Sequence, residues 1–585
     1  MTHGPVDRQI GETTVALPTV HARIPHPRSA PGASPAPLKD RPIRWWVYAL
    51  VIAVLLGQMA VAMVTAARQQ SPIVDEPVYV GTSVVYLQQR SLRYNYEHPP
   101  LAKLIMAMGL VFADARMPPA DFKGSQWHLG DSVLYRQGND AQQLLFLARL
   151  PLVILTLLFG LVAFAFARDL AGPPAGLVAL ALYAFSPDII AHGSLATLDL
   201  PMAGFLLTTL WLLWRARARP LRYLPLAGLA LGAAPATKMS ALPALPLAAL
   251  LTLLSVWHAG SRPRARKLMA GIGAAAGVIA IAIATTWATY LLVDPNLRWS
   301  APPKLPVVDG LTGHIIDWLP LPQPFRDGMR LQFGFEDATF PGYLLGEHYT
   351  GSKWYYLPTA LLIKEPLGMM ALWLAGGTAM LAFRRLRAAA SYILAPTAVL
   401  LLVAMTGARD FGVRYAIVVP VVLAVAAGCV LAVQRRWTNV VTLLLILFVA
   451  VSSLRTFPYY LPYSNEAFGG TSQTHTQLTD SNVDWGQDLA RLADRLADKY
   501  PGEPVWLVYK GRGEPTYYGI NARHPLTVPA DQVHGLIVVS TTCLRLQTCI
   551  PAGTDIPTGP RRLQELLDSS THIDTVGHAI LIYRR

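Results

Sequence analysis

Long apolar segments separated by short arginine-rich breaks constrain this chain more than any other feature of its sequence. The first, Trp45 to Ala67, is about 23 residues long, enough for a helix to cross a membrane. No cleavage site follows it, so we expect it to stay as an anchor. Only 14% of the 585 residues are charged, against about 25% in an ordinary soluble protein. Ten more apolar segments follow, at residues 144–167, 172–187, 199–214, 221–236, 239–258, 268–292, 357–383, 390–407, 413–433 and 437–454.

These segments predict an α-helical polytopic membrane protein with about eleven transmembrane helices. The net charge of +14 does not indicate nucleic acid as a partner, because the basic residues cluster in the breaks near Arg215, Arg262, Arg384 and Arg435. These breaks lie on the cytoplasmic side if the N-terminus does. Residues 1–44 are then a disordered cytoplasmic tail, residues 45–454 form the membrane module, and loops 68–143 and 293–356 lie outside.

Residues 455–585 follow the last span and therefore also lie outside. Their pattern predicts helices at 484–500 and 561–567 and strands at 504–509, 535–540 and 579–583, which together form a small α/β domain. Cys543 and Cys549 can form a disulfide if that compartment is oxidising, whereas Cys429 lies in a span.

Ionisable residues gather just beyond the first span, where each is a candidate for function. The segments are Asp75-Glu76-Pro77-Val78-Tyr79 and Glu97-His98-Pro99-Pro100-Leu101-Ala102-Lys103. A structural alternative exists for both. Asp75 can cap a helix over 77–89, and Glu97 and His98 can cap an interfacial helix over 99–112.

An acidic pair after the first helix, followed by an acid-x-Pro-Pro segment with a lysine, resembles the protein O-mannosyltransferase and lipid A aminoarabinose transferase group of the GT-C glycosyltransferases. The segment from Asp480 to Asp488 is similar to one in bacterial members of this type. The resemblance extends through Arg149-Leu150-Pro151, Ser186-Pro187-Asp188, Thr197-Leu198-Asp199-Leu200-Pro201, Thr237-Lys238-Met239-Ser240 and Arg414-Tyr415.

The resemblance implies a GT-C fold in a bacterial inner membrane and inverting transfer of a sugar from a polyprenyl-phosphate donor. Asp75 is then the catalytic base, with Glu76 and Glu97 as supporting acids. No metal ligand is assigned and no cofactor is certain, although a divalent metal is possible. The acceptor stays open between lipid, glycan and protein. The remaining candidates are Lys238, Arg414, Arg149 and Lys364 for the donor phosphate, and Tyr79, His98, Asp199 and His348 for substrate contacts.

Several of these residues have other interpretations. Arg149 can reach the membrane interface without a ligand, and Lys364 can pair with Glu365. Asp188 and Asp199 can pair across neighbouring helices. The cluster from Asp480 to Asp488 is more typical of a solvated helix start than of a metal site. For the whole chain, a transporter of a lipid-linked or anionic substrate is the main alternative, and a noncatalytic assembly or receptor protein is the third.

Overall fold

The computed structural model describes residues 45–119, 121–259, 263–302, 304–551 and 558–585. The tail predicted for residues 1–44 lies outside these described residues. The described residues from Trp46 to Arg585 form one compact unit. Every element below belongs to it, except that the first helix begins one residue earlier, at Trp45.

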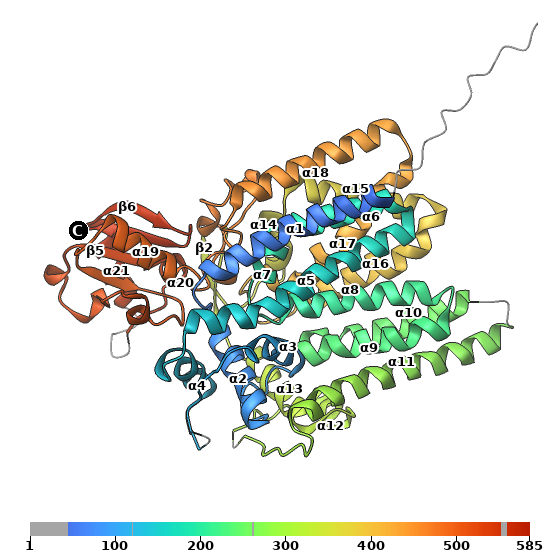
Figure 1. The fold of residues 1–585 in the computed structure, drawn as a ribbon, viewed down its shortest axis with the longest axis horizontal. Coiled ribbons are helices and arrows are strands. Elements are labelled where there is room, and N and C mark those ends of the chain that lie inside the picture. Colours follow the sequence, from blue (N-terminus) through green and yellow to red (C-terminus); the bar gives the residue numbers. More distant parts are fainter. Residues whose placement is uncertain (1–44, 120, 260–262, 303, 552–557) are drawn as a thin grey trace, which may run out of the picture. The chain divides into compact units, whose positions relative to one another are not determined.

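Helices make up most of the described chain (Figure 1). Those before the second long loop are α1 (Trp45–Gln69), α2 (Glu76–Gln89), α3 (Leu101–Leu110), α4 (Gln126–Asp131), α5 (Ala141–Ala171), α6 (Pro173–Ala184), α7 (Pro187–Gly193), α8 (Asp199–Ala216), α9 (Pro220–Thr237), α10 (Ala244–His258) and α11 (Arg264–Val293). Those that follow, up to the last apolar segment, are α12 (Gly310–Trp318), α13 (Gln323–Glu336), α14 (Tyr356–Lys364), α15 (Leu367–Ala382), α16 (Arg384–Ala404), α17 (Val418–Gly428) and α18 (Arg436–Thr456).

The number of helices able to cross a membrane is smaller than the sequence predicts. Among the described residues, six are long and apolar enough, or up to eight if each of two bent pairs counts as one span. Each of the eleven predicted segments does contain helix, but several of these helices are short. The six are Trp45–Gln69, Ala141–Ala171, Met239–His258, Arg264–Val293, Arg384–Ala404 and Arg436–Thr456.

The segment expected as one span over 357–383 is broken. Helices α14 and α15 meet at an angle of 115°. Glu365 between them has an extended backbone, as the residue before a proline prefers, and Pro366 cannot continue the hydrogen bonding of α14. A smaller bend of 63° separates α6 from α7 just before Pro187.

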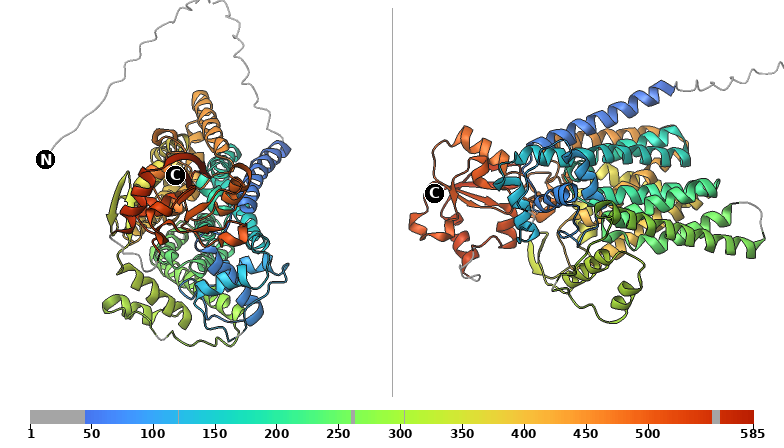
Figure 2. Two further views of the ribbon diagram at one scale, coloured as in Figure 1. Left: turned by 90° about the vertical axis from the view of Figure 1, so that its left-hand side faces the viewer. Right: turned by 60° about the horizontal axis from the view of Figure 1, so that its bottom comes forward.

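Glycines let the long helices approach closely, as expected where apolar surroundings leave packing to small residues. A Cβ atom at Gly232 of α9 would lie 2.4 Å from the carbonyl oxygen of Ala282 in α11, and one at Gly376 of α15 would lie 2.1 Å from that of Ala426 in α17. Helices α9, α10 and α11 accordingly lie side by side (Figures 1 and 2).

The two long loops carry their own structure. In the first, α2 and α3 occur where interfacial helices were predicted, and both pack with α5. In the second, α12 and α13 precede an antiparallel hairpin of β1 (Pro341–Leu344) and β2 (Glu347–Thr350), none of which the sequence predicted.

The C-terminal residues contain a five-stranded mixed sheet with the order β4-β3-β5-β7-β6. Alternate residues of the central strand β5 face opposite sides. Leu536 and Val538 pack with α19, and Ile537 and Val539 pack with α21. The elements are α19 (Leu489–Lys499), β3 (Val505–Val508), β4 (Ala522–Arg523), β5 (Leu536–Ser540), α20 (Thr541–Leu546), α21 (Gly559–Asp568), β6 (Thr571–Val576) and β7 (Ile580–Arg584).

Three of these strands and α21 lie close to their predicted positions. The helix predicted to begin at Asp484 begins at Leu489 instead. A disulfide joins Cys543 in α20 to Cys549, with their Cα atoms 5.5 Å apart. That residues 455–585 form a domain of their own stays a prediction.

Candidate active site

The carboxylate of Asp75 lies against the guanidinium group of Arg414. Nη1 of Arg414 donates to Oδ2 of Asp75 at 2.9 Å. Asp75 occupies the N-cap position of α2, but its side chain makes no capping hydrogen bond. The N-cap interpretation of Asp75 is therefore wrong for its carboxylate, which points to a cation instead. Since 21% of its side-chain surface stays exposed, the carboxylate can be reached by a substrate.

A second ion pair adjoins the first. Asp199, at the start of α8, accepts a hydrogen bond from Nζ of Lys238, which follows α9, and its other oxygen lies 3.9 Å from Nη1 of Arg414. The side chains of Asp75, Arg414, Asp199 and Lys238 thus alternate in charge. Four segments far apart in the sequence supply them, and their formal charges sum to zero.

Two aromatic rings cover the cations. The ring of Trp485 has its centroid 4.2 Å from the Arg414 guanidinium carbon, and that of Tyr415 lies 4.9 Å from Nζ of Lys238 and 5.1 Å from the Arg414 carbon. Rings at these distances stabilise cations that have lost water.

A largely apolar cavity of about 530 Å³ has Lys238 and Tyr415 in its lining. Its polar lining includes His98, Gln332, Glu336 and Arg409. Arg409 donates to Gln332 at 3.0 Å and to Glu336 at 3.1 Å. The apolar part of the lining comes mainly from α8, α16 and the start of α17, with Met202, Leu206, Leu400, Leu401, Val418 and Val419.

Tyr79 and His98 connect this region to the first outer loop. Tyr79 lies one turn after Asp75 in α2, and its ring meets that of His98 edge to face at 5.9 Å. Burial raises the pKa of Tyr79, and the nearby charge of Asp75 raises it further. Burial, together with the charges of Lys238 and Lys103, holds the pKa of His98 well below its usual range. His98 is therefore neutral near pH 7.

Glu97 lies beside His98 but is held separately. Its Oε1 accepts hydrogen bonds from Asn95 at 2.9 Å and Gln126 at 2.6 Å, while Oε2 has no partner among the described residues. The buried Lys103 fixes the surrounding loop by donating to the backbone and side-chain oxygens of Asn95 and to the carbonyl of His98, all within 2.8 Å. Neither Glu97 nor His98 caps α3, whose N-cap residue is Pro100.

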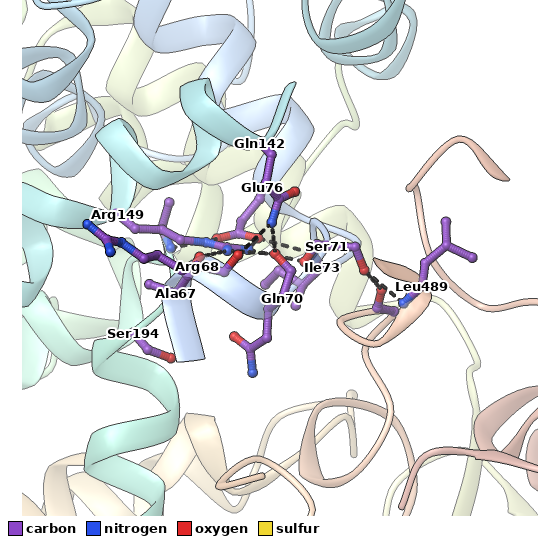
Figure 3. Close-up of polar contacts among 12 residues, drawn as sticks. Ala67, Arg68, Gln70, Ser71, Ile73, Glu76, Gln142, Arg149, Ser194 and Leu489 are labelled. Carbon is purple, nitrogen blue, oxygen red and sulfur yellow. Dashed lines mark hydrogen bonds and ion pairs between the residues drawn. The ribbon is translucent and has the colours of Figure 1, made fainter. Parts of the chain in front are cut away.

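Glu76 and Arg149 form a closed, fully buried pair (Figure 3). Nε and Nη2 of Arg149 lie 2.7 and 2.5 Å from the two carboxylate oxygens. Glu76 also accepts from the backbone N–H groups of Ile73 and Ala196, and Arg149 donates to the carbonyls of Ala67, Gln70 and Ser71. Neither side chain has exposed surface, so Arg149 does not reach the membrane interface.

Lys364, another candidate for the donor phosphate, is also buried. Its Nζ donates to the carbonyls of Leu461 and Asn482 at 2.6 and 2.9 Å and lies 3.2 Å from Oδ1 of Asp188 in α7. Asp188, and not Glu365, is therefore its ion-pair partner. These contacts hold the bend between α14 and α15 against the segment that follows α18.

The segment from Asp480 to Asp488 completes the site, although the sequence favoured a solvated helix start there. It is buried, and its backbone bonds to the segment before Asp75: Val74 N–H donates to the carbonyl of Trp485, and Ser71 N–H to that of Gln487, both at 3.0 Å. Ser71 Oγ also donates to the Gly486 carbonyl and accepts from Leu489 N–H (Figure 3). The expectation of a solvated segment is thus wrong.

Within that segment, Asn482 and Asp484 provide the anchors. Asn482 accepts from Val413 N–H, next to Arg414, at 2.9 Å and donates to the Tyr356 hydroxyl. Asp484 accepts from the Ser540 hydroxyl at the end of β5 and from Thr542 N–H in α20. Burial raises the pKa of Asp484 to about 6, even though these hydrogen bonds oppose the shift.

The last candidate, His348, is not brought to this site. It is exposed on β2, opposite Tyr343 in the hairpin. Across the described part of the chain, no group of three or more His, Cys, Asp or Glu side chains is arranged to hold a metal ion.

Comparisons with known proteins bear on part of this architecture. Residues 141–290 match the family model for dolichyl-phosphate-mannose-protein mannosyltransferase. This region contains Arg149, Asp188, Asp199 and Lys238. No curated protein sequence gives a significant match to the chain.

Solved structures of low sequence identity align with longer parts of the chain. ArnT from Cupriavidus metallidurans in the apo state is 16% identical, with a TM-score of 0.47, and the alignment covers 92% of this chain and 97% of that one. The same protein bound to undecaprenyl phosphate is 15% identical, with a TM-score of 0.46 and the same coverage. The Pmt1-Pmt2 protein O-mannosyltransferase of S. cerevisiae bound to its sugar donor is 20% identical, with a TM-score of 0.33, over 42% of this chain and 33% of that one.

The family match covers the ordered motifs from Arg149 to Lys238 that carried the resemblance. It therefore confirms that this chain is similar to the GT-C glycosyltransferases of the protein O-mannosyltransferase type.

Proposed function

We propose that this protein is an inverting glycosyltransferase that moves a sugar from a polyprenyl-phosphate donor to a hydroxyl group of an acceptor. One observation carries the proposal: the accessible Asp75 carboxylate is held by Arg414, beside the Lys238–Asp199 pair that opens into an apolar cavity. A carboxylate, two cations and an apolar cavity are the groups that such a transfer needs. The family match over residues 141–290 supports the same chemistry.

Asp75 acts as the general base in this proposal. It accepts the proton of the acceptor hydroxyl as that oxygen bonds to the anomeric carbon of the sugar. The bond between the anomeric carbon and the phosphate oxygen breaks on the opposite face, and the phosphate leaves with the electron pair. The configuration at the anomeric carbon inverts.

Lys238 and Arg414 stabilise the leaving phosphate. Each has N–H groups beyond those engaged with Asp199 and Asp75, and Nε of Arg414 has no partner within the described residues. Charge-assisted hydrogen bonds to a phosphate are short and strong, particularly where water is excluded. The apolar lining of the cavity at Lys238 suits the first isoprene units attached to that phosphate.

Glu76, Arg149 and Lys364 take positioning roles instead of the catalytic and phosphate-binding roles expected from the sequence. Arg149 binds three carbonyls at the end of α1 and the carboxylate next to Asp75, and thereby fixes the turn that presents Asp75. Lys364 is fully engaged away from the cavity. His348 is left without a role in the reaction.

The protein acts in a bacterial inner membrane, with its N-terminus in the cytoplasm and with Asp75 and residues 455–585 on the outer side. The arginine-rich breaks support this orientation, as does a disulfide at Cys543 and Cys549, which suits an oxidising compartment. The donor carries a hexose or a pentose.

The test uses the purified full-length protein in detergent with a panel of polyprenyl-phosphate hexoses and pentoses and an extract of cell-envelope acceptors. Mass spectrometry follows loss of the lipid-linked sugar, release of polyprenyl phosphate and the mass gain of the acceptor. We expect transfer from one donor. The protein is also reconstituted in proteoliposomes and tested for transport. If it moves the polyprenyl-phosphate sugar or an anion across the membrane without cleaving the sugar–phosphate bond, it is the transporter that the sequence left as the alternative.

A further inference from the structure

A second cavity, of about 850 Å³, lies between the two long loops and is separate from the one at Lys238. Residues 91, 93–97 and 122–126 of the first loop line it, together with residues 298–302 of the second loop and Leu331 of α13. Its volume falls within the range of about 300–1,000 Å³ that is usual for small-ligand sites.

The lining combines flat aromatic rings with hydrogen-bonding groups. Tyr96 and Trp299 meet edge to face at 5.5 Å, and the Trp299 indole N–H donates to buried Asp327 at 2.8 Å, which fixes that ring. Glu97 and Gln126, which are joined by a hydrogen bond, line the same cavity. Rings that pack against C–H faces, beside paired oxygen and amide groups that bind hydroxyls, make up a surface suited to a saccharide.

Glu97 gives this cavity a specific hydrogen-bond acceptor. The residue is only 6% exposed, Asn95 and Gln126 occupy its Oε1, and Oε2 has no partner among the described residues. A buried carboxylate oxygen strongly favours a donor, and a sugar hydroxyl is one.

The two cavities share a wall. Glu97 lines the second cavity and its neighbour His98 lines the first. Gln332 of α13 also lines the first cavity and donates to the Glu97 carbonyl at 3.0 Å. The wall is close-packed, since a Cβ atom at Gly328 of α13 would lie 2.2 Å from the carbonyl oxygen of Tyr96. His98 also contacts the ring of Tyr79, which lies one turn after Asp75.

From this arrangement we infer that the second cavity binds a saccharide portion of the acceptor, with Glu97 and Trp299 as its principal contacts. The inference rests on the proposed function and adds the chemical class of the acceptor. It also separates Glu97 from the proton transfer at Asp75 and gives it a role in acceptor binding.

The test measures binding of the full-length protein in detergent to an array of immobilised glycans, without donor. The variants are Glu97→Gln, Trp299→Leu and Trp299→Tyr. The matched control is Trp318→Leu, which changes an exposed tryptophan of the same loop outside the cavity. Size-exclusion chromatography and melting temperature check that each variant is folded. Because Trp299 is only half-buried, its variants keep the test decisive if Glu97→Gln does not fold.

We expect the parent and Trp318→Leu to bind the same glycans. Glu97→Gln and Trp299→Leu should bind them about tenfold or more weakly, as expected on loss of a charged hydrogen bond or an aromatic contact. Trp299→Tyr should keep most of the affinity. Absence of glycan binding by the parent, or equal binding by all variants, would overturn the inference. Binding to a peptide array that is lost in the same variants would also overturn it, since it would indicate a protein acceptor.

Donor cleavage is measured separately on the same preparations. Donor cleavage without glycan binding overturns this inference and leaves the proposed function standing. Glycan binding without cleavage of any donor would leave the saccharide site standing and overturn the proposed function.

Discussion

Arg414 donates a hydrogen bond to Asp75, 339 residues earlier in the chain, with Nη1 2.9 Å from Oδ2. The ring of Trp485 covers the same guanidinium group, and the Trp485 carbonyl accepts a hydrogen bond from Val74 N–H. Trp485, which lies beyond the last apolar helix, therefore contacts both Arg414, the cation that binds the proposed base, and Val74, the residue before that base.

Trp485 should consequently affect catalysis through Arg414. A cation over an indole ring away from water contributes about 2 kcal/mol, so we expect Trp485→Leu to lower kcat about tenfold or more. Trp485→Phe, which keeps a ring, should recover part of this loss. Steady-state kinetics and melting temperatures of both variants provide the measurement. A lower melting temperature in Trp485→Leu with an unchanged kcat would leave Trp485 a packing role only.

Glu76→Gln tests the closed pair with Arg149. Removal of one partner leaves a buried charge without compensation, which typically costs about 3–5 kcal/mol. We therefore expect Glu76→Gln and Arg149→Met each to reduce the yield and melting temperature sharply. The double variant should lose less than the sum of the two single variants. Stable single variants with a large loss of rate would instead support the direct roles that the sequence suggested.

The sequence predicted helices at the apolar segments because a membrane helix depends on length and composition alone. It also placed Asp75, Asp199, Lys238 and Arg414 among the candidate residues. The break at Glu365-Pro366 was missed, although a proline after two charged residues was visible in the segment. A hydropathy reading averages over such a break.

The ion-pair and hydrogen-bond partners of the candidate residues were harder to predict than the candidate residues themselves. Glu76 stands next to Asp75 in the sequence, yet their carboxylates face different arginines, because a helix turns successive side chains to different directions. The burial of the segment from Asp480 to Asp488 depends on backbone hydrogen bonds to residues 71–74, and no local pattern carries that information. The one sequence signal for this burial was Trp485 among the carboxylates, because tryptophan side chains are largely buried on average.

Lys238→Met and Lys364→Met form a matched comparison of two lysines with an aspartate partner. Loss of a charged hydrogen bond to the donor phosphate should weaken donor binding by about 1.5–3 kcal/mol in Lys238→Met. Lys364→Met should instead lower the melting temperature, because Asp188 loses its ion-pair partner and two carbonyls lose their donor. Titration with polyprenyl phosphate and thermal unfolding separate the two effects. Weaker donor binding in Lys364→Met, with a lower melting temperature in Lys238→Met, would exchange the two assignments.

Asp484 predicts a dependence of stability on pH. Burial raises its folded-state pKa to about 6 from 3.8, so the folded protein binds more protons than the unfolded chain between these values. The contribution of Asp484 to stability is therefore greatest below about pH 4 and is lost as the pH rises through 6. Relative to Asp484→Asn, the parent should become less stable between pH 4 and pH 7, by up to about 3 kcal/mol. Melting curves of both proteins at these pH values provide the check, and parallel curves would contradict it.

Asp75→Asn addresses the proposed base directly, since asparagine keeps the size of the side chain and an oxygen that can accept from Arg414 but cannot take a proton from the acceptor. The measurement is the initial rate of sugar transfer by the purified variant, at saturating donor and acceptor, beside its donor affinity and melting temperature. We expect a rate about 10²–10⁴-fold below that of the parent, with donor affinity and melting temperature nearly unchanged. A transfer rate close to that of the parent would contradict the assignment of Asp75 as the catalytic base.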